Sequence, residues 1–130
     1  MSMLTLHASV LYRFLSAGEV ALGIVHVSAT ATLYDGLTTR ALWFASGGVM
    51  IALTGAMNLL RQAYGQSAPG VRRVAIAANI VLVIFTALNG IASHASAGAW
   101  AMVAVLGGAP AMLCLVPSAQ RPAISAPQGT

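Results

Sequence analysis

The chain has no lysine, only eight charged side chains and a single cysteine. Charged residues make up 6% of its 130 residues, whereas hydrophobic residues make up 58%. A water-soluble domain carries about a quarter charged residues, because these side chains solvate its surface. Six arginines, one Glu and one Asp are too few to cover a water-facing surface of this size. The sequence therefore predicts that most of the molecular surface faces lipid.

The same scarcity excludes several kinds of site. A nucleic-acid-binding face needs a dense basic patch, but the arginines stand singly or in pairs at the ends of apolar segments, so we expect no nucleic-acid partner. The single Cys114 excludes an intramolecular disulfide and a metal site built from several cysteines. No nucleotide-binding or hydrolase motif occurs. The sequence therefore favours a protein that is not an enzyme.

Four apolar runs have the length that a helix needs to cross about 30 Å of hydrocarbon. The predicted spans are residues 14–33, 42–60, 74–91 and 99–116. Short connections make neighbouring spans antiparallel, and the middle connection, 61–73, is longer and contains Gly and Pro. We predict an all-α membrane protein whose residues 1–116 form a left-handed, antiparallel four-helix bundle. The Pro-, Ser- and Ala-containing tail, 117–130, is predicted to be disordered.

The arginines also predict the orientation of the bundle. Four spans place both termini and the middle connection on one side of the membrane, and that side carries Arg13, Arg61, Arg72, Arg73 and Arg121. The other side carries only Arg40. Because positive charge is retained in the cytoplasm, we predict an inner-membrane protein with cytoplasmic termini. Arg61, Arg72 and Arg73 are expected to contact anionic lipid headgroups.

One alternative concerns the first span. Ala29-Thr30-Ala31 has the form of a signal-peptidase site after an apolar run. Cleavage there would leave three spans. The lone Arg13 before the run and Glu19 within it both argue against this interpretation.

Small and polar residues recur at steps of three and four in each span, which keeps them on one helix face. In the first span this face holds Tyr12, Ser16, Glu19, Gly23, His26 and Thr30. The second has Gly47, Ile51, Thr54, Asn58 and Arg61, the third Asn79, Leu82, Thr86, Asn89 and Ser93, and the fourth Ala104, Gly107, Ala111, Cys114 and Ser118. Small residues let membrane helices approach, and polar groups bond across the interface. The four faces are therefore predicted to meet inside the bundle.

Glu19 is the strongest functional candidate on these faces. It lies about 5–7 Å to the cytoplasmic side of its span centre, at the level of Asn79 and close to Asn58. A carboxylate at such depth costs at least about 2.5 kcal/mol, so it faces the interior and is usually functional. We expect Asn58 and Asn79 to bond to it. A neutral Glu19 with a purely structural role is the alternative.

His26 and Thr86 mark a second polar level, about 4–5 Å beyond the span centres on the other side, with Asn89 further out. His26 could relay protons or ligate a metal or haem, in the latter case paired with the same residue of a second subunit. The alternative is a neutral His26 bonded to Thr86 or Asn89. No other feature of the sequence indicates a cofactor, so the identity of any bound cofactor stays open.

The size, the four spans and Ala17-Gly18-Glu19-Val20 in the first span resemble the small multidrug resistance transporters. The resemblance implies proton exchange at Glu19 within an antiparallel dimer. It covers one helix only. The third span, between Asn79 and Asn89, lacks that family's aromatic substrate motif, and the loop charges are biased rather than balanced, so membership is not claimed.

Several functions are consistent with these features. The first prediction is a non-catalytic accessory or structural component of the membrane, as a homo-oligomer or within a larger complex. The second is a proton-coupled transporter or permease component that uses Glu19 with His26. A haem-, metal- or quinone-binding protein that uses His26 is the third, and an enzyme acting on a lipid-like substrate through Glu19 is the fourth.

Overall fold

The computed structural model describes residues 3–115, and every regular element in this range is helical. Helix α1 spans Met3–Leu33, α2 spans Thr39–Tyr64 and α3 spans Pro69–Ala92. The fourth helix consists of α4 (Ala97–Val103), a π-helical turn η1 (Ala104–Gly108) and α5 (Ala109–Leu115). The predicted all-α four-helix fold is confirmed. The tail predicted at 117–130, with Val116 and Ser118, lies outside the described residues.

All four helices are longer than the apolar runs that predicted them. The connection between α2 and α3 is residues 65–68, much shorter than the predicted 61–73. Hydropathy marks where a helix leaves the hydrocarbon, whereas backbone hydrogen bonding continues until a capping residue ends it. Thr38 caps α2 by accepting a hydrogen bond from the Ala41 N–H at 3.1 Å, and Pro69 occupies the first turn of α3, where its missing N–H is harmless.

The fourth helix is irregular next to Pro110. A proline cannot donate a backbone hydrogen bond, and its ring clashes with the carbonyl four residues earlier. The chain widens into the π-turn Ala104–Gly108 directly before this point. Pro110 therefore accounts physically for the π-turn that interrupts the fourth helix.

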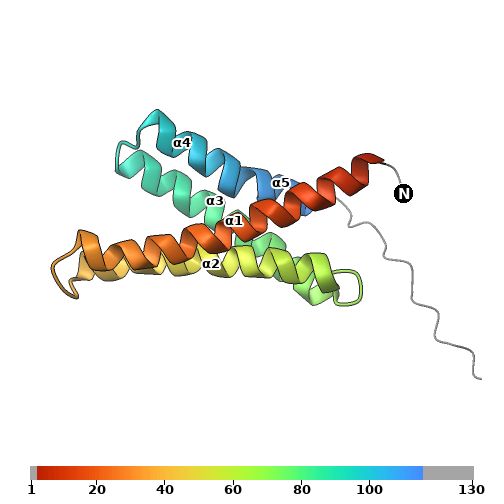
Figure 1. The fold of residues 1–130 in the computed structure, drawn as a ribbon, viewed down its shortest axis with the longest axis horizontal. Helices are drawn as coiled ribbons and strands as arrows, with labels where there is room; N and C mark the ends of the chain where they lie inside the picture. Colours follow the sequence, from red (N-terminus) through yellow and green to blue (C-terminus); the bar gives the residue numbers. More distant parts are fainter. Residues whose placement is uncertain (1–2, 116–130) are drawn as a thin grey trace, which may run out of the picture.

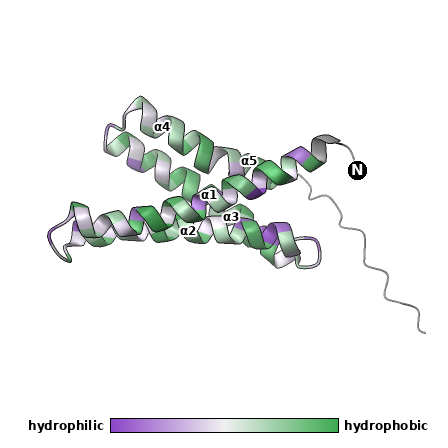
Figure 2. Cartoon of the chain, in the orientation of Figure 1, coloured by the Kyte–Doolittle hydropathy of each residue, from purple (hydrophilic) through white to green (hydrophobic). Residues whose placement is uncertain are grey.

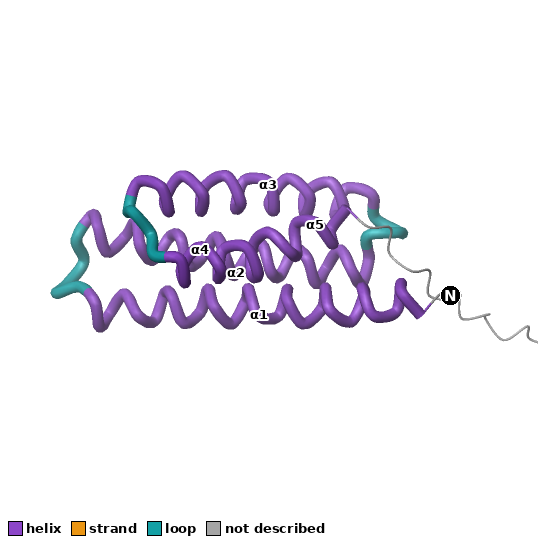
Figure 3. The backbone as a smooth tube through the Cα atoms, turned by 90° about the horizontal axis from the view of Figure 1, so that it is seen from above, coloured by secondary structure: helices purple, strands orange, loops and turns teal. Residues whose placement is uncertain are grey.

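The helices form two hairpins, α1–α2 and α3–α4–α5, which cross near the middle of the molecule (Figure 1). Connections 34–38 and 93–96 share one end, called here the loop end (Figure 3). The opposite end, called the terminal end, contains the start of α1, connection 65–68 and the end of α5. The fourth helix contacts α1 through η1 and α5. The hairpins diverge toward the loop end.

Glycines bring α1 and α2 into very close contact. A Cβ atom built on Gly23 would lie 2.5 Å from the Gly48 carbonyl oxygen, and one on Gly48 would lie 2.9 Å from the Gly23 carbonyl oxygen. A Cβ atom on Gly55 would lie 2.6 Å from the Ser16 carbonyl oxygen. Such approach is typical of membrane helices packed through small residues. Gly48 and Gly55, rather than the predicted Gly47, are thus the contact glycines of α2.

The distribution of side chains is inverted relative to a water-soluble bundle. Hydrophobic residues run along every helix (Figure 2), and large ones such as Phe14, Leu53 and Leu88 are more than 60% exposed. The buried side chains include polar or charged ones on each of α1, α2 and α3. Each of the four helices is long and apolar enough to cross a membrane. The chain is therefore a small multi-pass membrane protein.

Candidate functional site

Asn58 on α2 is the centre of a buried hydrogen-bond network. Its carboxamide nitrogen donates to Glu19 Oε2 at 2.9 Å and to Asn79 Oδ1 at 3.2 Å. Its carboxamide oxygen accepts from the Tyr12 hydroxyl at 2.8 Å and from Asn79 Nδ2 at 2.6 Å. Asn79 also donates to the Ala75 carbonyl at 2.7 Å. One amide thus connects α1, α2 and α3, and every polar atom of its side chain is used.

Glu19 is fully enclosed in this network. Its exposed fraction is 0%, as is that of Asn58, and that of Asn79 is 2%. Asn58 contacts Oε2, but Glu19 Oε1 has no hydrogen-bond partner within residues 3–115. A carboxyl group presents either two acceptor oxygens or one donor and one acceptor, and an unmatched buried atom is costly in both states. The network therefore leaves room for one further interaction at Glu19.

Arg61 and Tyr12 extend the network toward the terminal end. The guanidinium carbon of Arg61 lies 5.3 Å from the centre of the Tyr12 ring, within the range of a cation–π contact. Both side chains are buried, with exposed fractions of 3% and 4%. Tyr12 also packs with the fully buried Cys114 of α5. The extended network therefore contains one buried cation and one buried carboxyl group.

The headgroup candidates are divided by the structure. Arg61, predicted in a connecting segment, lies within α2 and is enclosed by protein, because the helix continues to Tyr64 and turns this position inward. Arg72 and Arg73 are exposed in the first turns of α3. Only these two of the three arginines are placed where a lipid headgroup could reach them.

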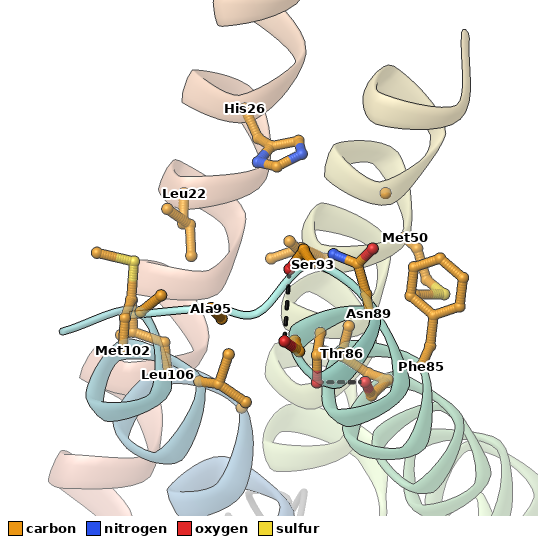
Figure 4. Close-up of a pocket in the computed structure, with 17 residues that line it drawn as sticks. Leu22, His26, Met50, Phe85, Thr86, Asn89, Ser93, Ala95, Met102 and Leu106 are labelled. Atoms are coloured by element: carbon orange, nitrogen blue, oxygen red, sulfur yellow. Dashed lines mark hydrogen bonds between the residues drawn. The ribbon is translucent and has the colours of Figure 1, made fainter. Parts of the chain in front are cut away.

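A pocket of about 260 Å³ opens between the hairpins in the half of the bundle nearer the loop end. His26, Thr86 and Asn89, the second group of candidates, all line it, together with large apolar side chains (Figure 4). Leu22 and Leu82 are also lining residues, and they stand three positions after Glu19 and Asn79 in their helices. Three residues correspond to about 4.5 Å of helix rise. One helical turn of apolar side chains therefore separates the pocket from the carboxyl group.

His26 contacts the ring of Phe44 and not the hydroxyl group of Thr86. Its imidazole stacks on Phe44 of α2, with ring centres 3.8 Å apart and an interplanar angle of 16°. Thr86 instead donates to the Leu82 carbonyl of its own helix at 2.7 Å. The hydroxyl can satisfy itself within α3, and the divergence of the hairpins keeps it away from α1. The alternative in which His26 bonds to Thr86 or Asn89 is therefore not observed within residues 3–115.

The remaining positions on the predicted faces follow the same division. Ser16 and Thr54 are buried but bond to carbonyls of their own helices, those of Tyr12 and Met50. Asn89 and Ser93 are exposed, because α3 leaves α1 and α2 toward the loop end. The faces meet where the hairpins cross and separate where they diverge.

Periodicity placed Tyr12 and Arg61 on the inward faces that also hold Glu19 and Asn58. It gave Tyr12 no functional role, and Arg61 was expected to contact lipid headgroups. Their part in the network was missed because polar residues at these positions suggested helix ends, but the helices continue past them.

No cluster of three or more His, Cys, Asp or Glu side chains occurs within the part of the chain that the structure describes. His26 alone supplies one imidazole to the pocket. The pocket walls are mainly apolar and the buried network mainly carboxamide and hydroxyl. These groups can bind a proton or a neutral molecule. Comparisons with protein families, curated proteins and solved structures found no match for this chain.

Proposed function

We propose that this chain is a proton-coupled transporter or permease component of the inner membrane, in which Glu19 takes up and releases the proton. The observation that carries the proposal is the completely buried carboxyl group with one partnered and one unpartnered oxygen. Ionisable groups inside membrane bundles mark ion and proton paths more often than they serve packing. A carboxamide such as Asn58 can bond to the carboxyl group in either protonation state, because it donates to an oxygen that is present in both.

The shape of the bundle supports the same proposal. The pocket lies in the half of the bundle nearer the loop end, and the buried network of Tyr12, Asn58 and Arg61 lies toward the terminal end. Glu19 lies between these two regions, one helical turn from the pocket floor. Alternating access requires a site that faces one side at a time. In this structure the pocket lies on one side of Glu19 only.

A structural role for the network is the second candidate, and the saturation of Asn58 favours it. Two donated and two accepted hydrogen bonds tie three helices together. Such a network would fix the bundle without any proton transfer. The two candidates differ in one property, which is whether Glu19 changes its protonation state in the physiological range.

Infrared difference spectroscopy can detect that change directly. Glu19 and Asp35 are the only acidic side chains of the chain, so the carboxylic C=O signal is simple to assign. We expect the purified protein in lipid nanodiscs to gain this signal on acidification between about pH 9 and about pH 5. The signal should disappear in Glu19→Gln and persist in the matched control Asp35→Asn, whose side chain lies in the exposed connection 34–38. A Glu19 signal that is constant over this range would leave only the structural role.

The proposal also assigns the terminal end to the cytoplasm. Arg13, Arg72 and Arg73 are exposed at that end, whereas Arg40, at the start of α2, is near the loop end. We propose that Arg72 and Arg73 contact anionic headgroups there.

Cysteine labelling tests this orientation. In a Cys114→Ala background, Leu37→Cys in connection 34–38 should react with a membrane-impermeant maleimide added to intact cells. Leu37 is 88% exposed. Ser67→Cys, in connection 65–68, should react only after the membrane is permeabilised. The opposite labelling pattern would reverse the assignment.

A further inference from the structure

We infer that the pocket at the loop end is a binding site for a small, neutral ring compound that carries a carbonyl oxygen. To call this compound the transported substrate rests on the proposed function, but the binding itself does not.

The walls select an apolar ligand. Leu22, Met50, Phe85, Met102 and Leu106 contribute from α1, α2, α3, α4 and η1. Ligand sites typically have volumes of about 300–1,000 Å³ and predominantly apolar linings. A volume of about 260 Å³ lies just below that range. The pocket therefore suits a molecule of one or two rings rather than a large drug.

The lack of charged side chains among the described lining residues of the pocket favours a neutral ligand. None of its described lining residues is Asp, Glu, Lys or Arg, and His26 is the single titratable side chain among them. Glu19 lies beyond the layer of Leu22 and Leu82, and Arg61 lies further still toward the terminal end. An organic cation or anion would lose its hydration without gaining a counter-ion. A neutral molecule loses far less hydration free energy when it enters the pocket.

Two polar groups give the pocket its chemistry. Figure 4 shows the imidazole of His26 on α1 and the carboxamide of Asn89 on α3 on facing walls of the same space. Phe44 covers one face of the imidazole, which fixes the plane of the ring. Asn89 always has two N–H donors, whereas the imidazole of His26 also contacts the Phe44 backbone. A carbonyl oxygen is the acceptor that can use the donors of Asn89 while the ring that carries it lies beside the imidazole.

Glycines provide the space for a flat ring. A Cβ atom on Gly107 would have no neighbour within 4 Å, and one on Gly47 would meet only His26 Nε2, at 3.8 Å. On the α3 wall, a Cβ atom on Gly90 would lie 2.8 Å from the Trp100 ring. Trp100 therefore packs against the backbone of a lining residue, and its fluorescence should report occupation of the pocket.

Tryptophan quenching tests the inference. Trp43 and Trp100 are the two tryptophans of the chain, so Trp43→Phe makes Trp100 the sole reporter. The probe is 2,3-dimethyl-1,4-naphthoquinone, a neutral two-ring compound with carbonyl oxygens, titrated into protein in lipid nanodiscs. We expect saturable quenching. The charged two-ring compounds 2-naphthoate and naphthylmethylammonium should give no saturable component.

Variants in the same background locate the site. Gly107→Leu should weaken binding by at least about tenfold, because its side chain would enter open pocket space. The matched control is Gly98→Leu, whose Cβ atom would meet only Ser96 Oγ, at 3.9 Å, and which should bind as the parent does. Asn89→Ala, at an exposed position that does not threaten folding, should weaken binding roughly 3- to 10-fold.

The outcomes separate the two proposals. Quenching that is linear in probe concentration would mean that the probe only partitions into lipid. Saturable quenching unchanged in both Gly107→Leu and Asn89→Ala would mean that the probe binds elsewhere. Either result would overturn the inference. Equal binding of the charged compounds would overturn its neutral class. Glu19→Gln should retain binding, since Glu19 is not a lining residue. A failed infrared titration would thus reject the proposed function and leave this binding site intact.

Discussion

Replacement of Gly55 by alanine is expected to force α1 away from α2 and to lower the free energy of unfolding by at least about 1–3 kcal/mol, the usual cost of overpacking. The added Cβ atom would lie 2.6 Å from the Ser16 carbonyl oxygen, 2.8 Å from Glu19 Cβ and 2.9 Å from the Val20 N–H nitrogen. Two of these three are backbone atoms, which cannot rotate away. The separation would also displace Glu19 from Asn58.

The measurement is reversible unfolding in detergent, followed by circular dichroism. Gly70→Ala is the matched control, because a Cβ atom at Gly70, in the first turn of α3, has no neighbour within 4 Å. It should be neutral or stabilise the protein by up to about 1 kcal/mol through helix propensity. Equal stability of the two variants would show that α1 and α2 are not in the close contact described.

The second large effect is expected at Asn58. Asn58→Leu keeps a side chain of similar size but removes the partners of the Tyr12 hydroxyl, of Glu19 Oε2 and of the Asn79 carboxamide. Hydrogen bonds between membrane helices are worth about 0.6 kcal/mol on average and up to about 1.7 kcal/mol. For three lost partners we expect the free energy of unfolding to fall by about 2–5 kcal/mol.

Thr54→Val is the control for this substitution. Thr54 lies one helical turn from Asn58 and is equally enclosed, but its hydroxyl donates to the Met50 carbonyl of its own helix. Loss of this hydroxyl group should lower the free energy of unfolding by less than about 1 kcal/mol. Tyr12→Phe should cost less in the Asn58→Leu background than in the native protein, because its partner is then already gone. Additive effects would contradict the hydrogen bond between Tyr12 and Asn58.

Much of the fold followed from composition and periodicity. The four apolar runs determined the number of helices, and the steps of three and four identified the inward faces that hold Glu19, Asn58 and Asn79. Both signals are local, because lipid solvates any sufficiently long apolar helix and the 3.6-residue repeat fixes which side chains share a face. Helix ends were less predictable, since polar residues such as Gln62 continue a helix beyond the hydrocarbon.

The pairing of side chains across helices could not be predicted in the same way. Periodicity orients one helix about its own axis, but the distance and angle between two helices depend on their closest contacts. Gly23, Gly48 and Gly55 set that distance for α1 and α2. The divergence of the second hairpin then decides that Asn79 reaches Asn58 whereas Thr86 does not reach His26.

Composition and hydropathy were sufficient to predict a membrane protein with four spans and one carboxyl group at depth. These properties are sums over local solvation free energies, which a linear chain already specifies. Contacts between helices were needed to show that Asn58 is the common partner of Tyr12, Glu19 and Asn79, that Arg61 is enclosed, and that His26 faces a pocket. Each of these depends on contacts between helices, whose geometry is fixed by packing at a few small residues.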